Sequence, residues 1–129
     1  MKTYHFPVRI FYEDTDHSGA VYYANYLKYM ERAREEVLGI DVLINLWKEK
    51  QIGFAVYSVN VKYTEAAVFG DQLDVRTTFK MDSPYRAILS QDIWKKNAVK
   101  PSITGVIELI CIDKDNRLLA FEKVIEIPA

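Results

Sequence analysis

The sequence predicts an α+β domain in which an antiparallel sheet of five or six strands wraps around one long helix. One strand-like segment comes first, two helical segments follow it, and the remaining strand-like segments come in succession. Successive strands joined by short turns favour antiparallel pairing. Helices that are separated from the strands along the chain indicate an α+β fold. The long helix has an apolar stripe that must be buried, and a single curved sheet would cover it.

The length and composition fit one globular domain over residues 1–129. Half of the residues are hydrophobic and 27% are charged, as in ordinary globular chains. Seventeen basic and eighteen acidic residues leave a formal charge of −1, so a basic nucleic-acid-binding surface is not expected. No apolar run approaches the ~20 residues of a membrane-spanning helix, and the N-terminus lacks a signal-peptide core. With Cys111 as the only cysteine, a cytoplasmic protein is expected.

The first two elements are predicted to be a strand and the long helix. Residues 4–12 are rich in Val, Ile, Phe and Tyr, which favour strands. The helix is expected over about residues 21–38, because apolar residues such as Tyr26 and Met30 recur at spacings of three and four. Gly39 is a typical residue for its C-terminal end.

A shorter helix and a series of strands are expected to complete the domain. The helix is predicted over residues 41–50, with Asp41 as its cap. Beyond it, apolar and polar residues alternate, which is the period of a strand. Turn-forming residues divide this part of the chain into the predicted strands 54–64, 72–81, 87–95, 100–112 and 118–127.

Two aspartates lie between the first strand and the long helix. Asp14 and Asp16 are followed at once by His17, Ser18 and Gly19, a set of residues that favours a turn. Either aspartate, or Ser18, could cap the helix. The same place could also serve catalysis, because a helix N-terminus offers free N–H donors to a developing negative charge. The pattern alone favours the cap for both aspartates.

The run that begins at Tyr12, Y-E-D-T-D-x-x-G-x-V-Y-x-x-N-Y, resembles the 4-hydroxybenzoyl-CoA thioesterase family of the hotdog fold. The nearest branch is that of the acyl-CoA thioesterases associated with the Tol–Pal system. Tyr63, Ala66, Ala67 and Asp71 resemble a second family element, with Ala66 where proline is common. The resemblance implies a hotdog fold. It also implies a homodimer or homotetramer with active sites between the subunits.

The resemblance also implies roles for individual residues. Asp16 would be the general base or the nucleophile, and the backbone N–H of Tyr23 would polarise the thioester carbonyl. Many relatives have His at the position of Tyr23, a difference that concerns rate or specificity. Tyr22 and Tyr26 are candidates for substrate contacts, although helix tyrosines are mostly core or interface residues. Arg86 is a candidate for contacts with the coenzyme A phosphates, although it is otherwise an ordinary surface charge.

The leading hypothesis is an acyl-CoA thioesterase that releases a carboxylic acid and coenzyme A and uses no further cofactor. A metal site is not expected, because the two histidines lack ligand spacing. The second hypothesis is a hotdog hydratase or dehydratase, which typically needs a helix histidine that residues 21–38 lack. The third is a non-catalytic module that binds acyl-CoA or acyl carrier protein. The sequence does not predict the acyl group.

Overall fold

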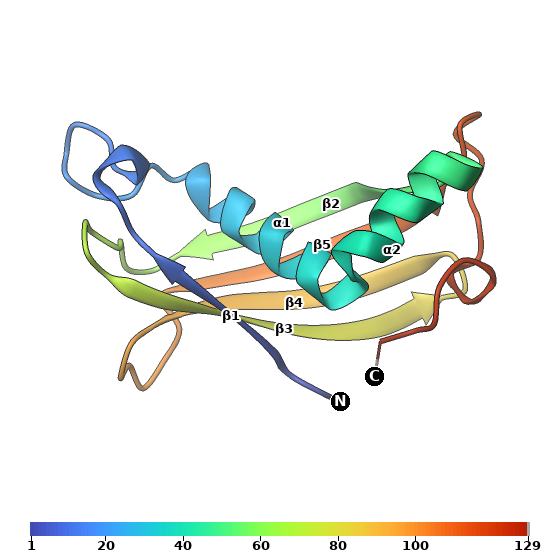
Figure 1. Ribbon diagram of the computed structural model, residues 1–129. Helices are drawn as coiled ribbons and strands as arrows, with labels where there is room; N and C mark the ends of the chain where they lie inside the picture. The colour runs from blue at the N-terminus through green and yellow to red at the C-terminus, as the bar shows by residue number, and fades with distance from the viewer. Residues whose placement is uncertain (129) are drawn as a thin grey trace.

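The computed structural model describes residues 1–128, in which five strands form one antiparallel sheet in the order β1-β3-β4-β5-β2. The main elements are β1 (Tyr4–Arg9), α1 (Asn25–Leu38), α2 (Ile40–Asn45), β2 (Gly53–Tyr63), β3 (Gln72–Ser83), β4 (Arg86–Lys95) and β5 (Ile103–Ile112). Figure 1 shows α1 lying across one face of the sheet. The predicted α+β architecture, a sheet around a central helix, is thereby confirmed.

Three short helical turns complete the described chain. They are the 3₁₀ turn η1 (Tyr12–Asp14), the π-helical turn η2 (Leu46–Lys50) and the 3₁₀ turn η3 (Phe121–Lys123). The turn η2 continues α2 directly, so the predicted second helix is present in two parts. No helix in residues 1–128 combines the length and the apolar character that crossing a membrane requires.

The core lies between α1 and the sheet. Buried and partly exposed residues alternate along β3, β4 and β5, as the period of two predicts. Facing these strands are the buried residues of α1, which are Tyr26, Tyr29, Met30, Ala33 and Arg34. Gly105 of β5 lies under Met30, where an added Cβ would come within 2.9 Å of Met30 Cε. The glycine therefore allows the helix to lie close to the sheet.

A buried polar network fixes the helix on the sheet. Arg34 Nη1 donates a hydrogen bond to Gln91 Oε1 at 3.0 Å. Gln91 Nε2 in turn donates to the carbonyl oxygen of Met30 at 2.9 Å and to Thr77 Oγ1 at 3.0 Å. Burial lowers the pKa of Arg34. Because a buried polar group without a partner costs about 1–3 kcal/mol, the network favours a single register of α1 on the sheet.

The predicted elements differ from the structure by three residues or more in four places: β1 ends at Arg9 and not at residue 12, β5 begins at Ile103 and not at residue 100, the long helix begins late, and one strand is absent. The helix begins at Asn25 and not near residue 21, because the backbone before it is used otherwise: the Val21 N–H donates to Ala67 O and the Tyr22 N–H donates to Asp14 O, at 2.9 and 3.0 Å. The strand predicted over 118–127 is absent. Leu118 makes an isolated bridge to Ile112, and the chain then turns through η3. The sheet accordingly has five strands.

The two ends of the sheet have different architectures. At one end, residues 10–22 and 64–71 form loops beside the start of α1; we call this the loop end (Figure 1). At the other, the β3–β4 turn meets the C-terminal segment, residues 118–128; we call this the hairpin end. There Phe121 is fully buried, with its ring centroid 5.4 Å from that of Phe54 and 6.3 Å from that of Phe79.

Candidate active site

Asp16 lies in a closed loop at the loop end. An isolated bridge joins Thr15 to Val21, and the Asp16 N–H donates to Ala20 O at 2.9 Å. Gly19 turns the chain back with φ of 88°, a left-handed conformation that favours glycine, and its N–H donates to Asp16 O at 3.0 Å. The loop is therefore held in shape by its own backbone, and the Asp16 side chain is presented at its surface.

The Asp16 carboxylate is exposed and caps no helix. Its Oδ1 accepts hydrogen bonds from the Ser18 hydroxyl at 2.6 Å and from the Ser18 N–H at 2.8 Å. These two bonds lower the pKa of Asp16 below its ordinary value, and the bond from the hydroxyl has the larger effect. Within residues 1–128, Oδ2 accepts no hydrogen bond. The cap interpretation of Asp16 is therefore wrong, because the nearest long helix begins nine residues later, at Asn25.

Asp14 is a turn residue, as the sequence predicts. Its Oδ2 accepts a hydrogen bond from the Phe11 N–H at 2.8 Å across the turn η1. Beneath it, the hydroxyl of Tyr29 is buried and makes no hydrogen bond within residues 1–128. Burial, and then the neighbouring Asp14 carboxylate, raise the pKa of Tyr29. Asp14 thus shapes the loop through one carboxylate oxygen, which holds the Phe11 N–H.

Free backbone donors lie just before α1. The N-cap residue, Ala24, has no side-chain cap, and the first turn is closed by a bond from the Asn25 N–H to Tyr22 O at 2.9 Å. Within the described chain, the N–H groups of Tyr23 and Ala24 donate to no acceptor. Unused donors at a helix N-terminus are suited to a developing oxyanion. The predicted donor, Tyr23, therefore has the free N–H that its role requires.

A pocket of about 210 Å³ opens beside these donors; we call it the tyrosine pocket. It is lined by Val21, Tyr23, Tyr26, Tyr63, Thr64, Glu65, Ala66 and Ile103. The ring centroid of Tyr63 lies 6.1 Å from that of Tyr23 and 5.7 Å from that of Tyr26. Burial raises the pKa of Tyr63. Tyr63 was not predicted as a site residue, although its place in the second family element was a signal for it.

The two tyrosines predicted to contact the substrate, Tyr26 and Tyr22, differ in how deeply they are buried. Tyr26 is buried in the wall of the tyrosine pocket, where its hydroxyl accepts a hydrogen bond from the Ala67 N–H at 3.0 Å. Burial raises the pKa of Tyr26. Tyr22 is half-exposed and stacks on Tyr23, with ring centroids 5.1 Å apart. Both therefore lie near Tyr23, but only Tyr26 lines the pocket.

Arg86 is not part of this cluster within one subunit. It opposes Ser83 at the hairpin end, whereas Gln72 at the other end of β3 lies near the loop end. Eleven residues of strand separate these ends, roughly 36 Å at ~3.3 Å per residue. The Arg86 guanidinium lies over the Tyr57 ring at 4.5 Å and 3.9 Å from Glu108 Oε2. Contact of Arg86 with coenzyme A stays a prediction, and it would require another subunit.

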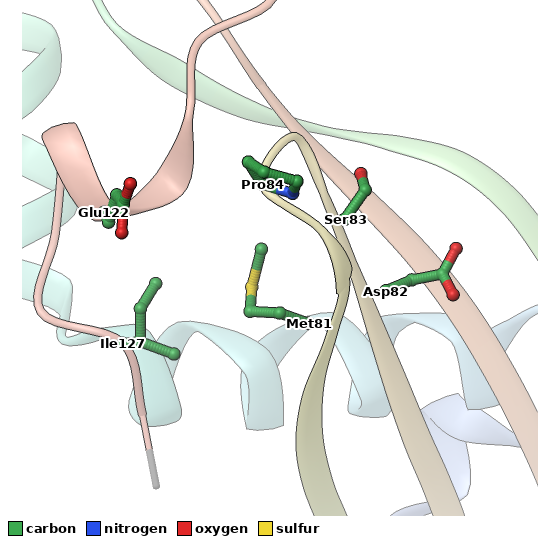
Figure 2. A pocket seen from close by; sticks show the side chains of 6 residues that line it. All are labelled: Met81, Asp82, Ser83, Pro84, Glu122 and Ile127. Atoms are coloured by element: carbon green, nitrogen blue, oxygen red, sulfur yellow. The ribbon is translucent and has the colours of Figure 1, made fainter.

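A second pocket, of about 260 Å³, lies at the hairpin end and is shown in Figure 2. The side chains of Met81 and Ile127 point into it, while the Asp82 carboxylate points away from the space between them (Figure 2). Its polar groups thus do not converge on one point, as a reaction centre would need. Residues 1–128 hold no cluster of three or more His, Cys, Asp or Glu side chains that could hold a metal ion.

The fold and the site together define a class of protein: a hotdog domain with an exposed carboxylate and unused amides at the start of its central helix. The chain belongs to the thioesterase-like superfamily, whose family model matches residues 11–129. The predicted family resemblance is thereby confirmed.

Individual relatives agree with this assignment. The chain is 34% identical over 110 residues to the acyl-CoA thioesterase YbgC of Haemophilus influenzae. The aligned region covers 84% of this chain and 79% of that protein. It is 39% identical over 87 residues to YbgC of Helicobacter pylori, covering 67% of this chain and 63% of that protein. The predicted enzyme class, a thioester hydrolase, is confirmed at the level of the family.

Among solved structures, a 1,4-dihydroxy-2-naphthoyl-CoA thioesterase from Synechocystis has the same fold. The TM-score is 0.83 at 20% identity, and the match covers 92% of this chain and 89% of that one. At this level of identity the likeness concerns the fold alone, and it confirms the hotdog architecture.

Proposed function

We propose that this enzyme hydrolyses an acyl- or aroyl-CoA thioester, with Asp16 as general base or nucleophile and the Tyr23 N–H as the donor to the carbonyl oxygen. The observation that carries the proposal is the pairing of two unused groups at the loop end. Asp16 has a carboxylate oxygen without a partner, and Tyr23 has an N–H without an acceptor, within the described chain. Tyr23 also lines the tyrosine pocket.

Two routes lead from this pair to the products. As a base, Asp16 takes a proton from water while the water oxygen attacks the thioester carbon. As a nucleophile, its carboxylate oxygen attacks that carbon to give a mixed anhydride, which water then hydrolyses. In both routes the C–S bond breaks and coenzyme A leaves as the thiolate, which takes up a proton. Both need an ionised carboxylate, the form that an Asp has at neutral pH already at the ordinary pKa of 3.8, from which the Ser18 hydrogen bonds lower the pKa of Asp16.

The amide of Tyr23 stabilises the charge that develops on the carbonyl oxygen. One well-placed oxyanion donor contributes about 10²–10³ in kcat, or about 2.7–4 kcal/mol. Because the donor is backbone, no side-chain substitution of Tyr23 removes it. The chemistry needs no cofactor, since coenzyme A is part of the substrate.

The enzyme is proposed to act as a homodimer or homotetramer, with its sites between subunits. The outer edge of β2 is unpaired in the sheet order, and its Val56, Tyr57 and Val59 are 44%, 59% and 46% exposed. An apolar groove of about 270 Å³, lined in part by Leu27, runs between α1 and this edge. Such an edge favours pairing with another copy. Sedimentation equilibrium tests this, because a mass of 15.0 kDa in solution would contradict it.

Two further expectations belong to the same proposal. The acyl group can also be presented on acyl carrier protein, because the thioester bond is the same as in acyl-CoA. Hydrolysis rates of the same acyl chain on coenzyme A and on acyl carrier protein would show which of the two substrates the enzyme prefers. We place the enzyme in the cytoplasm, where its single buried thiol, Cys111, would stay reduced. A fluorescent fusion that localised elsewhere would contradict this.

The test of the function is Asp16→Asn, assayed by thiol release over a panel of acyl-CoAs. General base catalysis contributes about 10²–10⁴, so turnover should fall by at least 100-fold. The melting temperature should stay unchanged, because the side chain is exposed and an Asn carbonyl can still accept the Ser18 bonds. Asp115→Asn, at an exposed turn of the hairpin end, is the matched control.

Other results of these assays would contradict the proposal or favour one of the alternative functions. Full activity of Asp16→Asn on every hydrolysed substrate would contradict the assignment. Tight binding of acyl-CoA without thiol release by the unaltered protein would favour the non-catalytic module. Addition of water to an enoyl-CoA would favour the hydratase.

A further inference from the structure

Besides the Thr15–Val21 bridge, the loop that carries Asp16 and the turn that carries Tyr23 meet at the carbonyl oxygen of Asp14. This oxygen accepts a hydrogen bond from the Tyr22 N–H at 3.0 Å and a second from Asn25 Nδ2 at 2.9 Å. Asp14 precedes Asp16 by two residues, and Tyr22 directly precedes Tyr23. The Asn25 side chain, fixed on the first residue of α1, therefore ties the carboxylate side of the site to the amide side.

The side chain of Asn25 makes this hydrogen bond to the loop and does not cap α1. The cap position is Ala24, and no side chain caps α1. Asn is a poorer helix former than Ala, because its amide competes for backbone hydrogen bonds. Here that amide reaches back eleven residues to Asp14, at a partly buried contact where water competes less. The contribution of the Asn25 side-chain amide is therefore its hydrogen bond to the loop.

Other side chains around the loop do not make the same connection. Thr15 Oγ1 donates to Tyr12 O at 2.7 Å, and Asp14 Oδ2 accepts from the Phe11 N–H, so both bonds stay inside the loop. The Tyr29 hydroxyl lies below Asp14 without a hydrogen bond. Within residues 1–128, Asn25 is the one residue of α1 whose side chain is hydrogen-bonded to residues 10–22.

We propose that Asn25 is a positioning residue, which sets the separation of the Asp16 carboxylate from the Tyr23 N–H without touching the substrate. The inference rests on the proposed function of these two groups. A displacement of about 1 Å at a reaction centre can cost about 10²-fold in rate. Loss of the link should therefore lower kcat by about 10- to 100-fold and leave KM nearly unchanged, because the tyrosine pocket is not altered.

The first test compares Asn25→Ala and Asn25→Asp with a matched control, Asn45→Ala, on the exposed end of α2. Asn25→Asp keeps the size of the side chain but replaces the donor by an oxygen that faces the Asp14 carbonyl. Both Asn25 variants should lose kcat at unchanged KM, while the control keeps both constants. Rates are normalised to the folded fraction from circular dichroism. If both Asn25 variants fail to fold, or lose activity only in proportion to the folded fraction, the role is structural and the proposal is overturned.

The second test is a double-mutant cycle with Asp16→Asn. If Asn25 acts through Asp16, Asn25→Ala should cause little further loss in the Asp16→Asn enzyme. An equal fold-loss in both backgrounds would show that Asn25 acts independently and would overturn the proposal. The cycle also separates the two hypotheses. A fully active Asp16→Asn contradicts the proposed function, whereas an inactive Asp16→Asn beside a normal Asn25→Ala contradicts only this inference.

Discussion

At the loop end of the sheet, polar groups of Asp16 and Tyr23 have no hydrogen-bond partner within residues 1–128. At the hairpin end, by contrast, the aromatic ring of Phe121 is fully buried. Within residues 1–128, the loop end holds a carboxylate oxygen on Asp16 and an N–H on Tyr23 without hydrogen-bond partners, and a pocket of about 210 Å³. The hairpin end holds a larger pocket, about 260 Å³, beside the fully buried Phe121. The proposed site is therefore chosen by its unsatisfied polar groups and not by pocket size.

The difference follows from what each end does for the fold. The Phe121 N–H donates to Pro84 O at 2.9 Å, and its ring packs on those of Phe54 and Phe79, so this end seals the core. The loops of the other end are held mainly by backbone bonds such as Ile10 N–H to Asp71 O at 2.9 Å. Although Ile10, Val21 and Ala67 are buried there, Asp16 and Ser18 remain exposed to solvent.

The largest effect on stability is expected from Phe121→Ala. Removing a fully buried Phe side chain costs about 3–5 kcal/mol of the free energy of unfolding. The turnover of the folded enzyme should nevertheless stay within about twofold, because the ring lies at the other end from Asp16. Denaturant unfolding and thiol release on the same samples measure the two quantities.

The matched variant at the loop end is Phe69→Ala. Its ring is 61% exposed, so the free energy of unfolding should change by no more than about 0.5 kcal/mol. A loss of turnover in folded Phe121→Ala protein would contradict the division of roles between the two ends.

A smaller effect is expected from Ser18→Ala. Its hydroxyl is the first cause of the lowered pKa of Asp16, so the variant should raise that pKa toward the ordinary 3.8. In the proposed mechanism Asp16 acts as the ionised form, so activity should be lost as the pH falls through its pKa. The acidic limb of kcat/KM should therefore move to higher pH. Ser83→Ala, which removes a hydroxyl bonded to the Tyr85 N–H at the hairpin end, should leave the limb in place. A limb that did not move in Ser18→Ala would mean that another group titrates there.

The strands and the central helix could be predicted because their periods are local. Alternation along β3, β4 and β5 matches the buried residues, and Gly39 ends α1 with φ of 96°. The late start of the helix and the absence of the last strand are both set by distant partners. The Val21 N–H donates to Ala67 O, so the chain there is not helical, and the alternation after Leu118 is overridden by the burial of Phe121 among other rings.

The candidate site was predictable in part. The family motif pointed to Asp16 and Tyr23, whose catalytic roles stay predictions; within residues 1–128 one Asp16 carboxylate oxygen and the Tyr23 N–H have no hydrogen-bond partner. Their tie through Asn25 was not predictable, because it depends on a side chain that meets a carbonyl eleven residues away. Tyr63 was missed as a pocket residue because the end of β2 meets the helix start only in three dimensions.

The proposed mechanism requires that the Asp16 carboxylate and the Tyr23 N–H act on the same thioester carbonyl. A crystal structure of Asp16→Asn with a slowly turned-over acyl-CoA would show this arrangement. We expect a carbonyl oxygen about 2.7–3.1 Å from the Tyr23 nitrogen and residue 16 about 3–3.5 Å from the carbonyl carbon, or one water away. A thioester bound elsewhere, such as in the hairpin-end pocket, with the Tyr23 N–H facing only solvent, would contradict it.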